Sequence, residues 1–62
     1  MIRTASDLFV GAHIREGDAT YLVDYLVSDD EGVYIEGYVV ESGDEFTNIY
    51  DYDDEVNIVK GE

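Results

Sequence analysis

The sequence predicts an all-β domain, folded as a small five-stranded barrel. Runs rich in β-branched and aromatic residues alternate with short acidic or glycine-containing turns, as in all-β domains. The chain has no proline, and almost no segment shows helical periodicity. Closing the sheet would also remove exposed strand edges, which are a hazard in a β-protein of only 62 residues.

The first half of the chain contains two of the expected strands. The first covers residues 8–15 and ends at a Glu-Gly-Asp turn at 16–18. The second covers residues 20–28, where every odd position from Tyr21 to Val27 is apolar, and this period of two is typical of a strand. Residues 6–10 are the one helical candidate, because Ser6 could cap a short turn before Gly11 ends it.

The second half contains the other three strands. Residues 29–32 form a hairpin turn in which Gly32 can take positive φ, and a strand follows at 33–40. Gly37 within that strand indicates a bulge or a sharp bend. A tight turn at 42–44 leads to the fourth strand, residues 45–50. We expect a turn of 3₁₀ helix at 51–54 and a last strand at 55–60.

Two tight central hairpins and a helical turn before the last strand are typical of an SH3-like barrel. A truncated OB-like barrel and a twisted antiparallel meander are the alternatives. One such barrel would occupy the whole chain as a single domain, residues 1–62. The expected core consists of Phe9, Ile14, Val23, Tyr25, Val27, Val33, Ile35, Val39, Phe46, Ile49, Val56 and Ile58.

Two resemblances accompany this prediction. Residues 7–14, followed by Gly17 and the strand beginning at 21–23, resemble the opening of SH3-like barrels in translation factors and KOW-type domains. The chain as a whole resembles short acidic proteins of actinobacterial bacteriophages. The phage resemblance implies a host-directed accessory protein that acts in the host cytoplasm. The translation-type barrels that contact RNA carry a basic surface, whereas this chain has only three Lys and Arg against sixteen Asp and Glu.

The charge of the chain indicates the kind of partner. Sixteen Asp and Glu oppose three Lys and Arg, which gives a net charge of −13. Direct binding to nucleic acid or to an anionic membrane needs a basic surface, so neither is expected, and a basic protein partner is. There is no cysteine, so disulfides and thiolate metal sites are excluded, and a cytoplasmic location fits.

We expect no enzymatic activity, no catalytic residues, no cofactor and no dedicated metal site. His13 is the only histidine, so it cannot build a histidine-based metal site by itself. The acidic run at 51–55 resembles a calcium loop, but Val56 stands where an EF-hand loop requires glycine. A barrel of this size also has little interior in which to raise the pKa of one of two paired carboxylates.

An acidic surface that includes tyrosines is the expected binding site. Tyr34, Glu36 and Tyr38 share one face of their strand, and tyrosine is enriched at interface hot spots. The candidate contacts are Asp24, Asp29, Asp30, Glu31, Tyr34, Glu36, Tyr38, Glu41, Asp44, Glu45, Asp51, Asp53 and Asp54.

Two hypotheses account for the acidity. In the first, a phage-encoded DNA or RNA mimic inhibits a basic nucleic-acid-binding host protein. Alternate strand residues lie about 6.6 Å apart, close to the spacing of neighbouring phosphates. In the second, the acidity is a halophilic adaptation of a small structural or adaptor domain, which as a homodimer would bury its spare tyrosines. Mimicry predicts acids concentrated on one face, whereas halophilic adaptation predicts them all around the surface.

Overall fold

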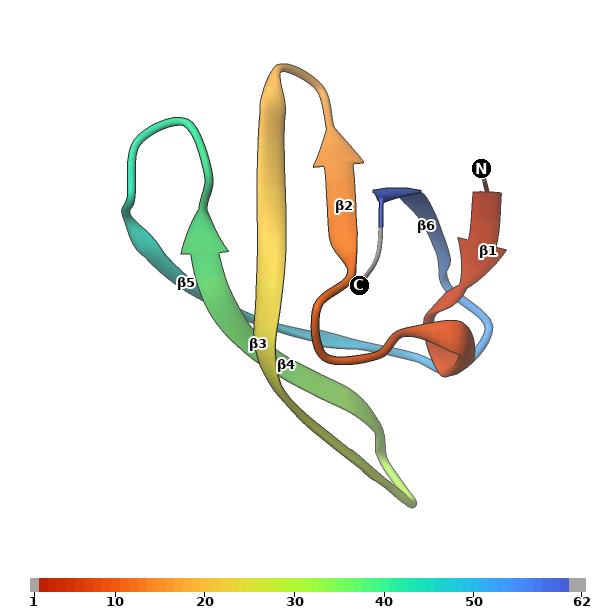
Figure 1. Cartoon of the computed structure of the whole chain (residues 1–62). Helices are drawn as coiled ribbons and strands as arrows, with labels where there is room; N and C mark the ends of the chain where they lie inside the picture. The colour runs from red at the N-terminus through yellow and green to blue at the C-terminus, as the bar shows by residue number, and fades with distance from the viewer. Residues whose placement is uncertain (1, 61–62) are drawn as a thin grey trace.

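The protein forms one antiparallel sheet of six strands in a computed structural model that describes residues 2–60 (Figure 1). The strands are β1 (Ile2–Thr4), β2 (His13–Glu16), β3 (Ala19–Asp29), β4 (Gly32–Val39), β5 (Glu45–Tyr50) and β6 (Glu55–Lys60). Their order across the sheet is β1-β6-β2-β3-β4-β5, so that β6 lies between β1 and β2. The all-β prediction is confirmed.

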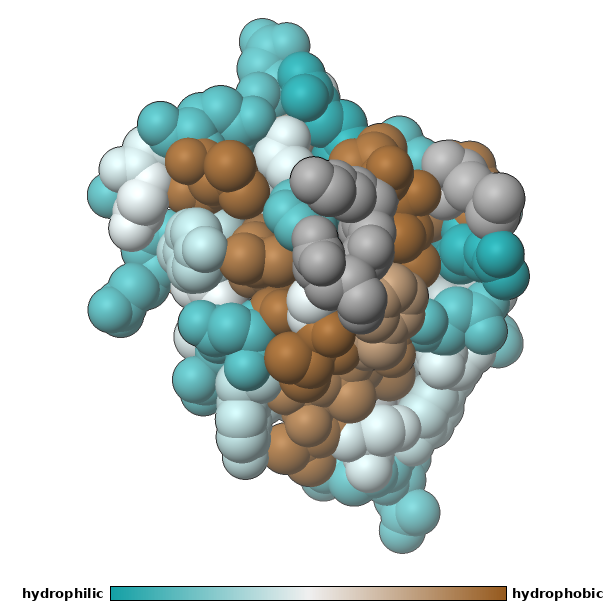
Figure 2. Space-filling view, viewed as in Figure 1, coloured by the Kyte–Doolittle hydropathy of each residue, from teal (hydrophilic) through white to brown (hydrophobic). Residues whose placement is uncertain are grey.

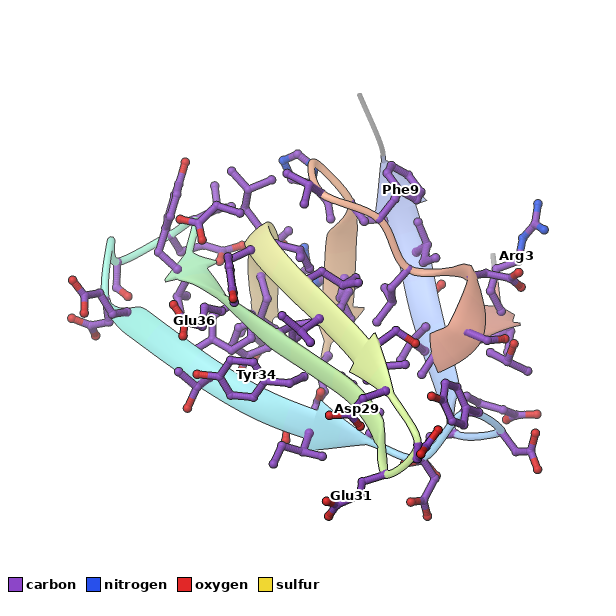
Figure 3. The ribbon with its side chains drawn as sticks, turned by 90° about the horizontal axis from the view of Figure 1, so that it is seen from below. Arg3, Phe9, Asp29, Glu31, Tyr34 and Glu36 are labelled. Carbon is purple, nitrogen blue, oxygen red and sulfur yellow. The ribbon has the colours of Figure 1, made fainter. Side chains whose placement is uncertain are left out.

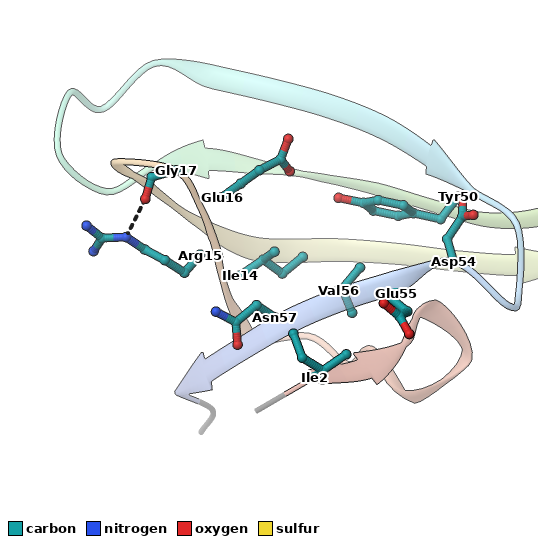
Figure 4. Close-up of a pocket in the computed structure, with 10 residues that line it drawn as sticks. All are labelled: Ile2, Ile14, Arg15, Glu16, Gly17, Tyr50, Asp54, Glu55, Val56 and Asn57. Atoms are coloured by element: carbon teal, nitrogen blue, oxygen red, sulfur yellow. Dashed lines mark hydrogen bonds between the residues drawn. The ribbon is translucent and has the colours of Figure 1, made fainter.

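The sheet is not closed into a barrel, so the expected five-stranded closed barrel is wrong in both respects. β1 is an additional strand, which pairs with β6 in the register Ile2↔Asn57 to Thr4↔Glu55. β1 and β5 remain the two edges of the sheet, with no ladder between them. Bending of the sheet nevertheless brings β5 opposite β6 across an open groove (Figure 4).

The start of the chain also differs from the prediction. Residues 8–12 were expected in the first strand, but β2 begins only at His13. A 3₁₀ helix, η1 (Ala5–Asp7), occupies the place of the short helix expected at residues 6–10. Its N-cap is Thr4 and not Ser6, and the Thr4 hydroxyl caps no backbone N–H but lies 2.8 Å from the Ser6 hydroxyl. Ala5 N donates to the carbonyl of Asp54, which ties η1 to the loop before β6.

That loop, residues 51–54, is a hydrogen-bonded turn and not the expected 3₁₀ helix. Asp54 N donates to the carbonyl of Asp51 over 3.0 Å, and Asp51 N donates to Asp54 Oδ2 over 2.9 Å. The carboxylate of Asp54 therefore stabilises the turn from within, as Asx side chains commonly do.

A β-bulge in β3 decides which side chains point to the core. Val23 pairs with Gly37 and Tyr25 with Glu36, so Asp24 is an extra residue. The alternation of side chains therefore restarts after Asp24, and Leu26 packs against the core. The bulge predicted from Gly37 is present, but on the partner strand.

The core lies on the concave side of the bent sheet, beneath η1 and the following loop. It consists of Ala5, Leu8, Ala12, Ile14, Val23, Val33, Ile35 and Val56, with Tyr21, Leu26, Phe46, Tyr50 and Ile58 packed against it. The predicted core was right for Ile14, Val23, Val33, Ile35 and Val56, and Phe46 and Ile58 lie at its margin.

Four predicted core residues are instead exposed. Phe9 is 40% exposed because its segment is a loop, whereas Tyr25 and Val27 face outward because of the bulge. Ile49 is 67% exposed, on the outer side of β5. Val39 is only partly buried.

Candidate binding surface

Three side chains, of which Val27 and Ile49 are exposed and Tyr34 is partly buried, form a row across the outer face of β3, β4 and β5. Val27 pairs with Tyr34, and Tyr34 pairs with Ile49, so the three lie side by side on one face. Tyr25, two residues from Val27 on the same face, is 49% exposed. We call these four residues together with Glu36 the tyrosine–carboxylate face.

Tyr34 is the centre of this face. Its hydroxyl donates to Glu36 Oε2 over 2.6 Å, and the two side chains lie along one strand (Figure 3). The ring of Tyr25 meets that of Tyr34 nearly edge-on, with centroids 6.4 Å apart and planes at 76°. The hydrogen bond to Glu36 raises the pKa of Tyr34, since ionisation would place a phenolate beside a carboxylate. The pair therefore presents a fixed aromatic ring with an adjacent carboxylate.

Two shallow grooves flank the Tyr34–Glu36 pair. The first, of about 390 Å³, is lined by Asp24, Glu36, Gly37, Tyr38, Gly43, Glu45, Phe46 and Thr47. The second, of about 280 Å³, is lined by Asp29, Glu31, Gly32, Tyr34 and Ile49. Among these described residues are five carboxylates and neither lysine nor arginine. A ligand lying across this face would meet apolar side chains between two acidic grooves.

Two acidic turns come together at one end of the face. The hairpin turn from β3 to β4 carries Asp29, Asp30 and Glu31, and the β5–β6 turn carries Asp51, Asp53 and Asp54. Gly32 lies so close to the backbone of Tyr50 and Asp51 that a side chain there would collide with it. Ser28 and Tyr52 approach each other to 3.5 Å through their hydroxyls. We call these six carboxylates the acidic end.

The predicted site residues therefore divide into three groups. Asp24, Tyr34, Glu36, Tyr38 and Glu45 lie on or beside the tyrosine–carboxylate face, and six others form the acidic end. The third group, Glu41 and Asp44, lies in the β4–β5 turn. Glu41 Oε1 accepts from Thr20 N over 2.9 Å, and Asp44 Oδ2 is 3.2 Å from Ser42 Oγ. Asp44 therefore contributes to the structure of the turn, whereas Glu41 joins the turn to the start of β3.

Tyr25, Val27 and Ile49 were missing from the predicted site because all three were placed in the core. The bulge at Asp24 exposes the first two, and no sequence pattern located it there. Gly37 was the nearest signal, since it lies opposite the bulge. Without a side chain, Gly37 leaves room for the Leu22 carbonyl and the Phe46 ring.

The described residues contain no group of three or more His, Cys, Asp or Glu that could hold a metal ion. No helix in the described part of the chain is long and apolar enough to cross a membrane. Hydrophilic residues gather at both ends of the molecule, with an apolar zone between them (Figure 2).

Comparisons with protein-family models, with curated proteins and with solved structures found no match to this chain.

Proposed function

We propose that this domain is a non-enzymatic binding module that recognises a basic segment of another protein. The observation that carries the proposal is the outward row Val27–Tyr34–Ile49, whose two outer members are exposed and which lies between two acidic grooves. Contact between exposed apolar side chains and water is unfavourable, so a partner that covers these side chains gains free energy from their burial. The surrounding carboxylates favour a positively charged partner.

Arginine is the basic residue that this surface suits best. A guanidinium can stack on a tyrosine ring and donate two parallel hydrogen bonds to a carboxylate. The ring of Tyr34 and the carboxylate of Glu36 provide these two partners side by side. Tyr25, edge-on to Tyr34, holds the ring in place and extends the apolar contact. Lysine lacks the planar fork and would bind this pair less well.

The most specific form of the proposal is mimicry of DNA or RNA. Asp29 and Glu31 belong both to the acidic end and to a groove beside Tyr34, so the carboxylates of the acidic end adjoin those of the face. Such a surface suits the basic groove of a nucleic-acid-binding protein, and a phage-encoded inhibitor would meet that protein in the host cytoplasm. Its binding would weaken steeply with salt.

Halophilic adaptation of a small structural or adaptor domain is the second candidate, and one observation favours it. Glu16, Asp18, Glu41, Asp44 and Glu45 lie at the turns from β2 to β3 and from β4 to β5, away from the acidic end. The acidity therefore extends beyond a single face. Under this alternative the spare tyrosines would be covered by a second copy of the chain.

The test is capture of basic proteins from a host lysate on three immobilised forms of the domain. These are the unmodified chain, the double variant Tyr34→Ala/Glu36→Gln, and the control Glu41→Gln/Asp44→Asn in the turn. We expect the unmodified chain and the control to retain the same protein, released at moderate salt, and the first variant to lose it. Release by added duplex DNA would support mimicry. Equal retention on all three forms would contradict the proposal.

As the finer description of the fold, we propose an SH3-like sheet that remains open. Its support is that β6 returns to pair with β2, in the register Ile14↔Ile58, after the two central hairpins. An experimental structure showing β6 paired elsewhere would contradict this relation.

A further inference from the structure

A trough runs along the unpaired edge of β5, on the concave side of the sheet. One groove of about 540 Å³ is lined by Ile2, Ile14, Arg15, Glu16, Gly17, Tyr50, Asp54, Glu55, Val56 and Asn57 (Figure 4). A second, of about 290 Å³, is lined by Glu16, Tyr21, Phe46, Thr47, Asn48 and Tyr50. Glu16 and Tyr50 line both, so the two grooves adjoin and follow β5 from Phe46 to Tyr50. We call them together the edge trough.

The floor of the trough is apolar and its rim is acidic. Ile14 and Val56 are core residues at one end, and the rings of Tyr21 and Phe46, with centroids 4.7 Å apart and planes tilted by 56°, lie at the other. Burial raises the pKa of Tyr50, and the charge of Glu16 contributes in the same direction.

The charges on the rim favour a positively charged occupant. Glu16, Asp54 and Glu55 supply three carboxylates, opposed by Arg15 alone among the described lining residues. The guanidinium of Arg15 already donates to the Gly17 carbonyl over 3.0 Å and to Thr20 Oγ1 over 3.2 Å.

The backbone of β5 has one row of hydrogen-bonding groups that faces away from β4 and pairs with none of the described strands. β5 is an edge strand, and among the six described strands it pairs with β4 alone. Ile49 N is bound by the side chain of its own neighbour, Asn48, over 2.9 Å, so this N–H faces the free edge. The β4–β5 register has no irregularity, so the N–H of Thr47 faces the same edge. An extended chain can pair with such an edge.

We propose that the edge trough binds an extended segment of a basic protein, which adds to β5 as a further strand. Inward side chains of an added strand recur every second residue, about 6.6 Å apart. A central inward Lys or Arg would meet Glu16, and the inward residues on either side would lie over the two apolar ends of the floor. The recognised pattern is therefore apolar-x-basic-x-apolar.

A second copy of the chain fits this edge poorly. Antiparallel pairing of two β5 edges would place Glu45 of one copy near Asp51 of the other, and like charges oppose such pairing. The trough lies on the face opposite the tyrosine–carboxylate face, and Tyr34 does not line it. The inference therefore stands apart from the proposed function.

The test uses the synthetic peptide acetyl-Val-Thr-Arg-Thr-Val-amide and the full chain, observed by amide NMR. We expect shifts and slowed hydrogen exchange along residues 45–50. Replacing the central Arg with Glu should weaken binding by about tenfold or more. Two further peptides carry N-methyl groups on alternate residues, in the two possible frames. In an added strand, one of these peptides has its methyl groups on the edge that faces β5, where they block hydrogen bonding, and the other has them on the far edge. Strand addition therefore predicts that the first peptide does not bind and that the second does.

Variants of the protein separate this site from the outer face. Glu16→Lys should weaken peptide binding by about tenfold or more, whereas Asp7→Lys, a charge change of the same size in η1 that lies outside both sites, should leave it unchanged. Thr47→Pro should abolish binding with the circular dichroism spectrum retained, because its N–H faces away from β4. If Thr47→Pro does not fold, the comparison of the two N-methylated peptides tests strand addition in its place. Equal binding of both frames, shifts confined to the outer face, or a dimer formed through β5 at NMR concentrations would overturn the proposal.

Discussion

Tyr34 and Glu36 show how two residues of one strand make a local chemical unit. They lie two positions apart on β4, so their side chains emerge on the same face, and a 2.6 Å hydrogen bond joins them. That shared face followed from the period of the strand alone. The contact with Tyr25 did not, because it depends on the bulge in the neighbouring strand.

The Tyr34–Glu36 bond should be visible in an alkaline titration. The folded state raises the pKa of Tyr34 above its ordinary value of 10.0. This bond therefore stabilises the fold fully at pH values below the pKa of Tyr34 in the unfolded chain. The stabilisation is lost as pH rises through the higher pKa of Tyr34 in the folded state. In a titration followed by tyrosinate absorbance, Tyr34→Phe should remove a late-titrating tyrosine, and Glu36→Gln should move that tyrosine earlier. Loss of an early-titrating tyrosine in Tyr34→Phe would contradict this.

Gly37 should tolerate no side chain. A methyl group there would collide with the Leu22 carbonyl and press on the Phe46 ring, and backbone cannot move aside cheaply. Gly37→Ala should lower the free energy of unfolding by about 1–3 kcal/mol or more, measured in urea. Gly43→Ala is the matched control, because its φ of 79° is strained for alanine but the surrounding space is open. It should cost only about 1–2 kcal/mol, and an equal loss in both variants would argue against the collision.

β3 is the element that gives the sheet two differently oriented parts. Residues 19–22 pair with β2 and, at residues 21–22, with β4 as well, whereas residues 25–29 pair as a strand with β4 alone, with the bulge at the transition. The bounds of β5 and β6 were predicted correctly from turn residues and β-propensity. The bulge and β1 were not, since one depends on a close approach of two backbones and the other on a partner more than fifty residues away.

Deletion of Asp24 should leave the fold intact. Val23 and Tyr25 would then follow each other directly, and both would keep their present partners on β4. Deletion of Thr47 is the control, because the β4–β5 ladder has no extra residue to lose. Residues on one side of the deletion would then point their inward side chains outward and their outward side chains inward. Circular dichroism and thermal melting should show a folded Asp24 deletion and a much less stable Thr47 deletion. Comparable unfolding of the two would contradict the bulge assignment.

Glu41 fastens the end of β4 to the start of β3. Its carboxylate accepts from Thr20 N, and this hydrogen bond lowers the pKa of Glu41. The bond therefore stabilises the fold fully above the pKa of Glu41 in the unfolded chain. This stabilisation is lost as pH falls through the lower pKa of the folded state. Glu41→Ala should therefore be less stable than the unmodified chain at neutral pH. The difference should shrink below about pH 4, measured by urea unfolding at several pH values. A pH-independent difference would assign the loss to packing.

Over the whole molecule, the charge opposes folding. A net charge of −13 sits on a domain with a radius of gyration of 10.5 Å, so many carboxylates lie within range of one another. Sequence composition predicted this charge and its turn positions well. It could not show that two turns distant in sequence meet at one end, because that arrangement depends on the close packing of Gly32 against β5.

Neutralising part of the acidic end should stabilise the fold while weakening partner binding. Asp29 and Asp54 are excluded because each carboxylate accepts a backbone hydrogen bond within its turn. The variant Asp30→Asn/Asp51→Asn/Asp53→Asn should raise the free energy of unfolding by about 0.5–1 kcal/mol at low salt, and less at high salt. Urea unfolding at two salt concentrations measures both. A loss of stability at high salt would support halophilic adaptation.

The position of β6 in the middle of the sheet has a consequence for synthesis. On the ribosome, β2 to β5 emerge as consecutive hairpins, but β1 and β2 have no strand between them until β6 follows. Ile2–Thr4 therefore remains without its strand partner until Glu55–Asn57 has been synthesised. Because this pairing closes a long loop, we expect it to be a late step in folding. Val56, which completes the core from β6, arrives in the same step. The sheet therefore remains unfinished until β6 has left the ribosome, and the insertion of β6 completes the sheet and the core in one step.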